Sequence, residues 1–368
     1  MRIGIDARMI DNTGIGRYLR NLLVHLARID MRNHYIVFIN ADNTRVVEQE
    51  NVQFVPLKFP VPLYSLREQW WLPIELLKAR LDVVHYPNFA IPLLPLYPSI
   101  VTIHDLIYYV YPDQCPSRLA HHYARFMLRQ ATRKARVLIT DSAYSKQDLI
   151  THFQVPAEKI EVIFPAAEQQ YCPPESPELP AAIALRYGIA GPYILYVGKH
   201  HPYKNIRTLV HAFNVYPEVY TQHQLVIAGK REPRRAALYQ EARSLQAGDA
   251  IVFTDFVPED DMFELYRHAQ LFVFPSLYEG FGLPPLEAMA CGVPVVASNA
   301  ASLPEVVGDA AIQVEPLDAH GMADAMRAVL TDPMLWSELH HKGLKRAQHF
   351  SWETAAQQLL AIYERFKK

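Results

Sequence analysis

The feature that most constrains the fold of this chain is an alternation of short apolar runs and helix-like segments, which occurs twice along the sequence. In the first half, runs with the length of buried strands lie at residues 1–7, 35–40, 52–56, 83–85, 100–104, 137–141 and 160–164, and helix-like segments lie at residues 16–27, 119–135 and 145–153. In the second half, the runs lie at residues 193–198, 224–228, 251–253, 271–274 and 293–297, and the helix-like segments lie at residues 205–213, 235–247, 260–268, 285–291, 319–330 and 352–366. Strands that alternate with helices favour a parallel sheet covered on both faces. The sequence therefore predicts an α/β fold with two Rossmann-like, doubly wound parallel sheets.

A proline-rich segment separates the two halves. Residues 165–180, PAAEQQYCPPESPELP, contain five prolines. Proline supplies no amide to a sheet and disfavours helix at the residue before it, so we interpret this segment as a linker. We expect an N-terminal domain over residues 1–170 and a C-terminal domain from residue 171, facing each other across a central cleft. Ligands collect at the carboxyl ends of such strands.

Composition excludes several classes of protein. Half of the 368 residues are hydrophobic (50%) and 20% are charged, which excludes a disordered or collagen-like chain. The net charge of −2 gives no reason to expect a nucleic-acid partner. The sequence has neither a secretory leader pattern nor an apolar stretch long enough to span a membrane, and its cysteines, Cys115, Cys172 and Cys291, are far apart. We therefore expect a cytoplasmic protein, either free or peripheral on the inner face of the cytoplasmic membrane.

The first half offers two candidate functional sites. Gly14 and Gly16 follow the first predicted strand and open the first predicted helix. Glycines in this place let backbone amides approach an anion at a helix N-terminus, although a tight strand-to-helix turn would use the same residues. His104 ends another apolar run, at the carboxyl end of a strand. There its ring would donate to an oxygen of a ligand, or would be a structural histidine held by the backbone.

Two lysines follow the first predicted strand of the second half. Lys199 and Lys204 lie in the run YVGKHHPYKN. Ammonium groups near a strand end can neutralise a diphosphate, but two solvated surface lysines would give the same pattern. Arg207, three residues after Lys204, either faces the same diphosphate as the lysines or lies on the exposed side of a helix.

The segment with the most chemical information runs from residue 276 to residue 294. Glu279 lies in a glycine-containing loop after a strand, and two prolines then favour the start of a helix that contains Glu287. The amides near Gly282 and Leu283 would face an anion at the positive end of that helix. Two carboxylates beside an anion site suit a phosphorylated, hydroxyl-rich ligand such as a sugar nucleotide.

This segment resembles retaining glycosyltransferases of the GT-B class, family 4. Glu279 and Glu287 are separated by seven residues, as in the E-x7-E signature of that family, within the run PSLYEGFGLPPLEAMACGVPVVAS. The later SLPEVVGDAA, and the earlier GxG, TIHD, TDSAYSKQDL and YVGKHHPYKN, occur in the order typical of the family. The resemblance implies a GT-B fold, an acceptor-binding domain at residues 1–170, a donor-binding domain at residues 171–350, and a final helix at residues 351–368 that packs back on the N-terminal domain. Some members carry an arginine in place of Lys199.

The resemblance also implies a role for each candidate. The implied catalytic residues are His104, Glu279 and Lys204, and the implied donor-binding residues are Gly14, Gly16, Lys199, Lys204, Gly282, Leu283, Glu279 and Glu287. Glu279 would hold hydroxyls of the donor sugar, Glu287 the ribose hydroxyls, and the lysines the diphosphate. Transfer would proceed by front-face attack, with the leaving phosphate taking the acceptor proton. No D-x-D triplet occurs, so we expect no metal and no cofactor other than the nucleotide sugar as co-substrate.

Two segments of the first half suggest contact with an acceptor or a membrane. Residues 118–136 have no acidic residue and carry Arg118, Arg125, Arg129 and Arg133. An apolar stripe is expected from Leu119, Tyr123, Phe126, Met127 and Gln130. Such a basic amphipathic helix lies on an anionic membrane or packs on a core with a solvated basic face, which is the more common arrangement. Trp70 and Trp71 would line an acceptor groove or, as we expect, pack in the core.

The preferred interpretation is a hexosyltransferase that moves mannose from GDP-mannose to a growing glycan or polyprenyl-linked acceptor in surface polysaccharide biosynthesis. A sugar-nucleotide epimerase of the same architecture would need no acceptor. A non-catalytic sugar-nucleotide-binding subunit of a larger complex would bind the nucleotide without converting it to product. A nicotinamide dehydrogenase is disfavoured because the full GxGxxG pattern is absent.

Overall fold

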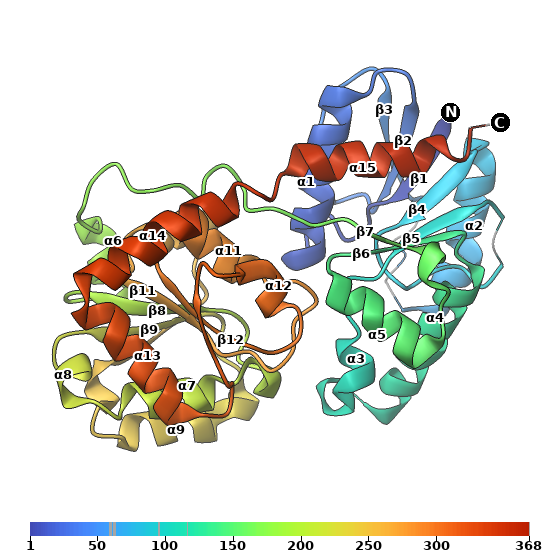
Figure 1. Cartoon of the computed structure of the whole chain (residues 1–368). Helices are drawn as coiled ribbons and strands as arrows, with labels where there is room; N and C mark the ends of the chain where they lie inside the picture. The colour runs from blue at the N-terminus through green and yellow to red at the C-terminus, as the bar shows by residue number, and fades with distance from the viewer. Residues whose placement is uncertain (59–60, 62–63, 95, 116, 368) are drawn as a thin grey trace. The chain divides into compact units, whose positions relative to one another are not determined.

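The computed structural model describes residues 1–368 except 59–60, 62–63, 95, 116 and 368. The chain divides into two compact units (Figure 1). Unit 1 comprises Met1–Pro165 and Ser351–Lys368, and unit 2 comprises Ala166–Phe350. Each unit is built on its own parallel sheet.

The sheet of unit 1 has seven strands in the order β3-β2-β1-β4-β5-β6-β7. Its strands are β1 (Arg2–Asp6), β2 (His34–Ile39), β3 (Val52–Pro56), β4 (Val83–Tyr86), β5 (Ser99–Thr102), β6 (Val137–Thr140) and β7 (Ile160–Val162). All neighbouring strands are parallel. The chain starts in the middle of the sheet, winds to one edge and resumes on the other side of β1. The winding direction therefore reverses between β1 and β4, which is where open sheets of this kind bind ligands.

Helices flank this sheet. They are α1 (Gly14–Ile29), α2 (Leu66–Ala79), α3 (Ile107–Val110), α4 (Arg118–Lys134), α5 (Ala143–Phe153) and α15 (Trp352–Glu364), with short 3-10 turns η1 (Pro112–Gln114) and η2 (Ala157–Lys159). Leu19, Leu22 and Leu26 recur at helical spacing on the buried face of α1. The last helix, α15, packs on α1, and the rings of Tyr18 and Trp352 meet edge to face with their centroids 5.9 Å apart. The end of the chain is therefore part of the first folding unit.

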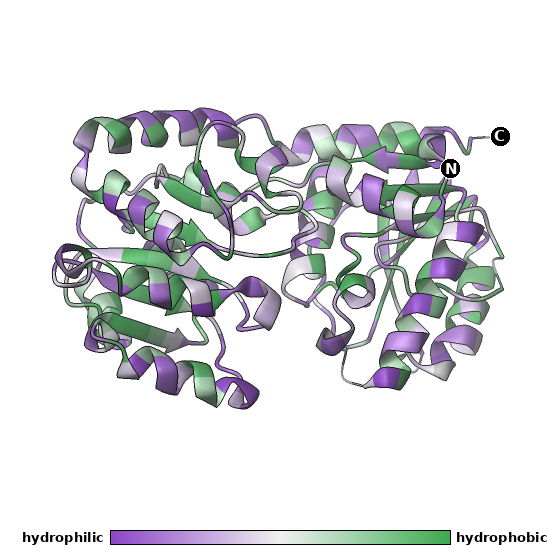
Figure 2. Ribbon diagram, turned by 60° about the horizontal axis from the view of Figure 1, so that its bottom comes forward, coloured by the Kyte–Doolittle hydropathy of each residue, from purple (hydrophilic) through white to green (hydrophobic). Residues whose placement is uncertain are grey.

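Unit 2 repeats the same winding with six strands in the order β10-β9-β8-β11-β12-β13. Its strands are β8 (Tyr193–Val197), β9 (Gln224–Ala228), β10 (Ile251–Asp255), β11 (Leu271–Phe274), β12 (Val295–Ser298) and β13 (Ile312–Val314). Its helices are α6 (Ala181–Tyr187), α7 (Ile206–Phe213), α8 (Pro217–Tyr220), α9 (Ala236–Ser244), α10 (Glu259–Arg267), α11 (Leu283–Ala290), α12 (Leu303–Val307), α13 (Ala319–Thr331) and α14 (Pro333–Ala347), with 3-10 turns η3 (Pro202–Lys204), η4 (Pro233–Arg235) and η5 (Gly248–Ala250). Figure 2 shows mostly apolar strands between helices of mixed polarity, as expected for a sheet covered on both faces. The switch point of this sheet lies between β8 and β11.

Two expectations about side-chain burial were wrong. Trp70 and Trp71 are 71% and 40% exposed, because they lie on α2, whose buried face is formed by Leu72 and Leu76. On α4 the buried face is formed by Ala124, Met127, Leu128, Ala131 and Thr132. Of the expected apolar stripe only Met127 is buried, whereas Leu119 is 81% exposed. Both helices therefore present large apolar side chains to solvent.

Candidate functional site

The carboxyl edge of the unit 2 sheet carries the predicted donor residues. Lys199 and Lys204 follow β8, and Glu279 follows β11. Because β8 and β11 are neighbours at the switch point, these loops meet although 75 residues separate Lys204 from Glu279. The backbone N–H of Leu277 donates to the carbonyl of Tyr203 at 2.7 Å and joins the two loops directly.

Lys204 and Glu279 form an ion pair through Nζ and Oε1. The two side chains are 13% and 14% exposed, so the pair is largely shielded from water. The ammonium group also lies over the rings of Tyr203 and Phe274, 5.2 and 5.4 Å from their centroids. Both charged groups are therefore held in place before a ligand arrives, and an anion that approaches Lys204 must compete with the carboxylate of Glu279.

The loop after Glu279 is fixed by a buried serine. The Oγ of Ser302 donates to the carbonyl of Phe281 at 2.6 Å and also lies 2.9 Å from the carbonyl oxygen of Glu279. Gly282 has a φ of +119°, and a Cβ there would lie 2.7 Å from the side chain of Leu303. Only glycine suits this turn. The helix that follows, α11, begins with Leu283 and the expected prolines, and Glu287 on it is 2% exposed.

His104 in unit 1 is held by two acceptors from neighbouring strand ends. Its Nδ1 lies 2.7 Å from Oδ2 of Asp141, which follows β6, and its Nε2 lies 3.2 Å from the carbonyl oxygen of Pro87, which follows β4. Tyr18 of α1 packs edge to face against the ring, with centroids 4.8 Å apart. Because neither acceptor can donate, both ring nitrogens must carry protons for both contacts to be hydrogen bonds.

The electrostatics of this group agree with its geometry. Burial disfavours the charged ring, but the Asp141 carboxylate, with contributions from Asp105 and the Pro87 carbonyl, raises the pKa of His104 above its ordinary value. The charged form of His104 is thus favoured at the carboxyl edge of the sheet, where its side chain is 16% exposed. Sequence reasoning missed Asp141, although its place at the end of the run 137–141 puts it at the same edge.

The two glycines at the start of α1 differ. A Cβ on Gly16 would lie 2.4 Å from the carbonyl oxygen of Ile10, so the helix packs too closely on the preceding loop for any larger residue. A Cβ on Gly14 would meet nothing within 4 Å. Gly16 is therefore required by the fold, and Gly14 is the open position at the first residue of the helix.

A buried charge network near the end of β1 was not anticipated. The Nη2 of Arg8 lies 2.6 Å from both Asp6 Oδ2 and Glu68 Oε1, and the side chains of Arg8 and Glu68 have no exposed surface. Burial alone would lower the pKa of Arg8, but the two carboxylates raise it above its usual range. Since Glu68 belongs to α2, the network fixes that helix to the carboxyl edge of the sheet.

Comparison with known proteins decides the family. The profile described as Glycosyltransferase Family 4 matches residues 12–169, and the profile described as Glycosyl transferases group 1 matches residues 189–350. The O-antigen chain mannosyltransferase B of Escherichia coli is 35% identical over 285 residues, which are 77% of this chain and 74% of that protein. The chain belongs to glycosyltransferase family 4. It is accordingly a hexosyltransferase.

Solved structures share the fold of this family 4 glycosyltransferase. Sucrose-phosphate synthase from Thermosynechococcus elongatus aligns with a TM-score of 0.77 at 23% identity, over 99% of this chain and 98% of that chain. HepE of Anabaena, solved with UDP-glucose, aligns with a TM-score of 0.77 at 19% identity, over 99% of this chain and 100% of that chain. At these identities the likeness concerns the fold alone, and the expected GT-B architecture of two Rossmann-like sheets is confirmed.

Within the glycosyltransferase, the predicted site residues fall into three groups. Unit 2 holds Lys199, Lys204, Glu279, Gly282, Leu283 and Glu287 around the β8 and β11 loops and the start of α11, and unit 1 holds Gly14, Gly16 and His104 at its carboxyl edge. The third group consists of the arginines of α4: Arg118, Arg129 and Arg133 are exposed, and Arg125 lies 5.2 Å above the ring of Tyr109.

Proposed function

We propose that this glycosyltransferase moves mannose from GDP-mannose, with retention of anomeric configuration, to a hydroxyl of a growing glycan or lipid-linked acceptor in O-antigen-type biosynthesis. The observation that carries the proposal is the Lys204–Glu279 pair beside the start of α11. The choice of mannose is supported by the relative from Escherichia coli, an O-antigen chain mannosyltransferase.

The donor would bind at the carboxyl edge of unit 2. A diphosphate there would take Lys204 from its carboxylate partner and would also draw in Lys199, which is exposed. Glu279, released from the lysine, would accept hydrogen bonds from sugar hydroxyls, and the buried Glu287 would hold the ribose. The positive end of α11, near Gly282 and Leu283, would add to the field on the phosphates.

Catalysis would rest on positioning and on stabilisation of the leaving diphosphate. Lys204 would stabilise the developing phosphate charge, and that phosphate would take the proton of the attacking hydroxyl. His104 would serve as a fixed positive charge on the acceptor side, because Asp141 and the Pro87 carbonyl already engage both of its ring N–H groups and a ring protonated on both nitrogens cannot accept a proton. Since the sequence has no D-x-D triplet, we propose that transfer needs no metal.

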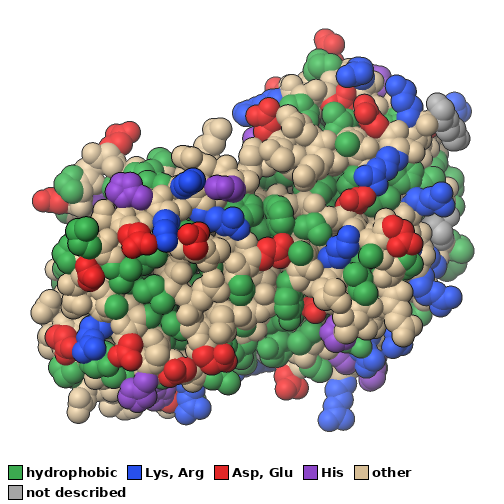
Figure 3. Space-filling model, viewed as in Figure 1, with side chains coloured by type: hydrophobic (Ala, Val, Ile, Leu, Met, Phe, Trp, Pro, Cys, Tyr) green, Lys and Arg blue, Asp and Glu red, His purple; other side chains and the backbone are tan. Residues whose placement is uncertain are grey.

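The acceptor side would contact a membrane. The exposed arginines of α4 lie beside the side chains of Leu119 and Phe126, which are 81% and 46% exposed. A surface that combines basic and large apolar side chains in this way suits contact with anionic lipid. Figure 3 shows blue Lys and Arg side chains along the right-hand side of unit 1. Among the described helices, none has both the length and the apolar character needed to cross a bilayer. We therefore propose a peripheral location on the cytoplasmic face.

A vesicle assay tests the membrane proposal. The double variant Arg129→Gln and Arg133→Gln should co-sediment less with anionic vesicles than the wild type. A matched variant of two exposed cations in unit 2, Arg243→Gln and Lys345→Gln, should sediment as the wild type. Equal binding of both variants would contradict membrane contact through α4.

Transfer assays test the proposed function. Lys204→Ala and Glu279→Gln should each lower transfer from GDP-mannose by about 100-fold or more, because each removes a charge from the donor site. Arg243→Gln, on the exposed side of α9, should keep the wild-type rate. EDTA should leave the wild-type rate unchanged. Wild-type rates in both site variants would refute the site, and loss of activity with EDTA that Mn²⁺ restores would refute metal independence. Turnover of the nucleotide sugar without an acceptor would indicate an epimerase.

A further inference from the structure

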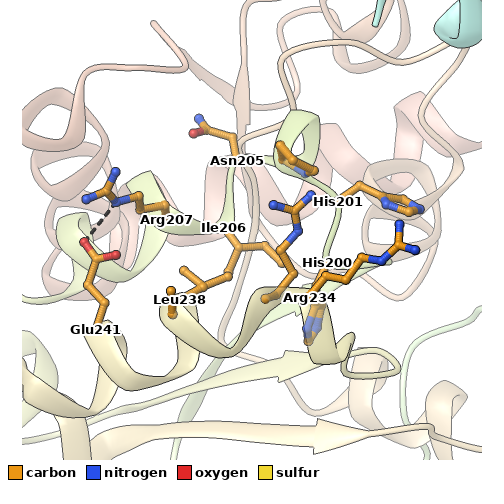
Figure 4. A pocket seen from close by; sticks show the side chains of 11 residues that line it. His200, His201, Asn205, Ile206, Arg207, Arg234, Leu238 and Glu241 are labelled. Atoms are coloured by element: carbon orange, nitrogen blue, oxygen red, sulfur yellow. Dashed lines mark hydrogen bonds and ion pairs between the residues drawn. The ribbon is translucent and has the colours of Figure 1, made fainter. Parts of the chain in front are cut away.

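A pocket lies in unit 2 beside the first turns of α7 and α9. It has a volume of about 450 Å³, within the range of small-molecule sites. Figure 4 shows the Arg207–Glu241 pair at one end and His200 and His201 at the other. Its wall is formed by His200, His201, Pro202, Asn205, Ile206, Arg207, Arg234, Arg235, Ala237, Leu238 and Glu241. The predicted donor residues Lys199, Lys204, Glu279 and Glu287 do not line it.

The pocket carries an excess of positive charge. Its one carboxylate, Glu241, is already bound by Arg207 Nε at 2.9 Å and by His211 Nε2 at 2.7 Å. Within the described part of the chain, the guanidinium groups of Arg234 and Arg235 have no ion-pair partner, and the Nε of Arg235 is buried without a hydrogen bond. A buried donor without a partner is costly unless a ligand or water satisfies it.

Two helix starts add to this field. α7 begins at Ile206, which lines the pocket. α9 begins at Ala236, and the next residue, Ala237, lines the pocket. Neither helix has an acidic residue in its first turn or a side-chain cap. No side chain of either first turn therefore opposes the positive ends of the two helices, an arrangement that favours anions, although the N–H of Ala236 already donates to the Pro233 carbonyl. Ile206, Ala237, Leu238 and Pro202 supply an apolar wall beside the cations.

The two histidines respond to the same surroundings. Burial lowers the pKa of His200 to about 4, so its ring is neutral at pH 7. Burial also lowers the pKa of His201; Glu232 opposes this shift, while Lys199, Lys204 and Arg235 add to it. His201 is therefore a reporter of the local potential, and an anion bound beside it would raise its pKa.

We propose that the α7–α9 pocket is a second anion site, which takes the phosphate or diphosphate group of a small phosphorylated molecule separately from the donor site. Arg234 and Arg235 would bind the anion, and the apolar wall would contact the rest of the molecule. The proposal stands on the pocket alone and does not depend on the choice of GDP-mannose as donor.

Calorimetry with inorganic pyrophosphate tests it on the full chain. The background variant Lys199→Gln and Lys204→Gln removes the donor-site cations, so the binding that remains reports the pocket. Adding Arg234→Gln and Arg235→Gln should weaken pyrophosphate binding and raise its Kd by about tenfold or more, because two charge-assisted contacts are lost. Adding Arg243→Gln and Lys345→Gln instead should leave the Kd unchanged, and thermal melts would show that all variants are folded.

An independent readout comes from the ring of His201. In the background variant, pyrophosphate should raise the pKa of His201 measured by NMR, and the added arginine substitutions should abolish this rise. The proposal is overturned if the background binds no pyrophosphate, or if the arginine substitutions leave its Kd unchanged. Repeating the titration with GDP and with farnesyl diphosphate separates the two sources of the diphosphate. If only GDP binding depends on Arg234 and Arg235, the ligand is a nucleotide; if only farnesyl diphosphate binding does, the ligand is a lipid carrier.

Discussion

His104 is held in one orientation by Asp141 and the Pro87 carbonyl, and the ring of Tyr18 packs against it edge to face. The sequence predicted its place at a strand end but left open whether it serves a ligand or the fold. Asp141 could not be assigned as its partner, because the pairing of β5 with β6 depends on strand order, which local patterns do not encode. The same reason hid the Lys204–Glu279 pair: both residues were expected at the donor, and their contact arises only because β8 and β11 are neighbours.

Replacing Asp141 tests the role of His104. In Asp141→Asn the ring loses its charged partner, so the pKa of His104 measured by NMR should fall, and transfer should slow by about tenfold or more. Asp148→Asn changes an acid elsewhere in unit 1 and should leave both quantities as in the wild type. A His104 pKa that does not move in Asp141→Asn would show that the carboxylate does not hold the ring protonated.

At the scale of elements, strands β1 to β12 and most of the longer helices were predictable, whereas α2, α6, α14 and β13 were missed. α1 and α11 follow from apolar spacing and from glycine or proline at their starts. α2 was missed because Pro73 interrupts its pattern and its tryptophans suggested a core segment, whereas the helix is amphipathic through Leu72 and Leu76 and is fixed by Glu68. The apolar stripe of α4 was only partly right: Met127 is buried and Tyr123 packs against the core, but Leu119 and Phe126 lie on the exposed side.

A matched pair of glycine variants tests the packing of α1. Gly16→Ala should lower the free energy of unfolding by about 1–3 kcal/mol, because its methyl group would meet the carbonyl of Ile10 at 2.4 Å. Gly14→Ala should change it by no more than about 0.5 kcal/mol, since the site is open. Urea denaturation measures both, and equal stability of the two variants would contradict the close approach at Gly16.

The docking of α15 should depend on pH through His85. This buried ring lies 2.8 Å from Tyr363 Oη of α15 and 2.8 Å from Thr102 Oγ1, and burial lowers its pKa to about 3. In the unfolded chain His85 takes up a proton near pH 6.5, whereas in the native state it stays neutral down to about pH 3. The buried, neutral ring therefore contributes its full stabilisation of the native state above pH 6.5, and this contribution decreases as the pH falls toward 3.

Denaturation of His85→Gln measures this contribution. The stability difference between the wild type and the variant should shrink as the pH is lowered from 7 to 4. Tyr363→Phe keeps the buried ring and should therefore retain the steep pH dependence, while losing about 1 kcal/mol for the missing hydrogen bond. A pH-independent difference for His85→Gln would contradict a neutral, buried His85.

At the scale of the whole molecule, two sheets with the same winding each present their functional residues at a carboxyl edge. The repetition of the α/β alternation predicted both sheets, the resemblance to family 4 implied the GT-B class, and the proline-rich segment 165–180 has neither helix nor strand. The anion pocket between α7 and α9 could not be predicted, because Arg207, Arg234 and Glu241 come together only through the packing of two helices on one face of the sheet.

The central claim, a metal-independent nucleotide-sugar site in unit 2, is tested most directly by thermal unfolding with GDP, UDP, dTDP, ADP and NAD in the presence of EDTA. A ligand at 100 times its Kd stabilises a folded protein by about 2.7 kcal/mol. We predict that GDP raises the Tm most, that NAD leaves it unchanged, and that the effect of GDP is lost in the double variant Lys204→Ala and Glu279→Gln. Stabilisation by NAD alone, or by no nucleotide, would contradict the donor site described here.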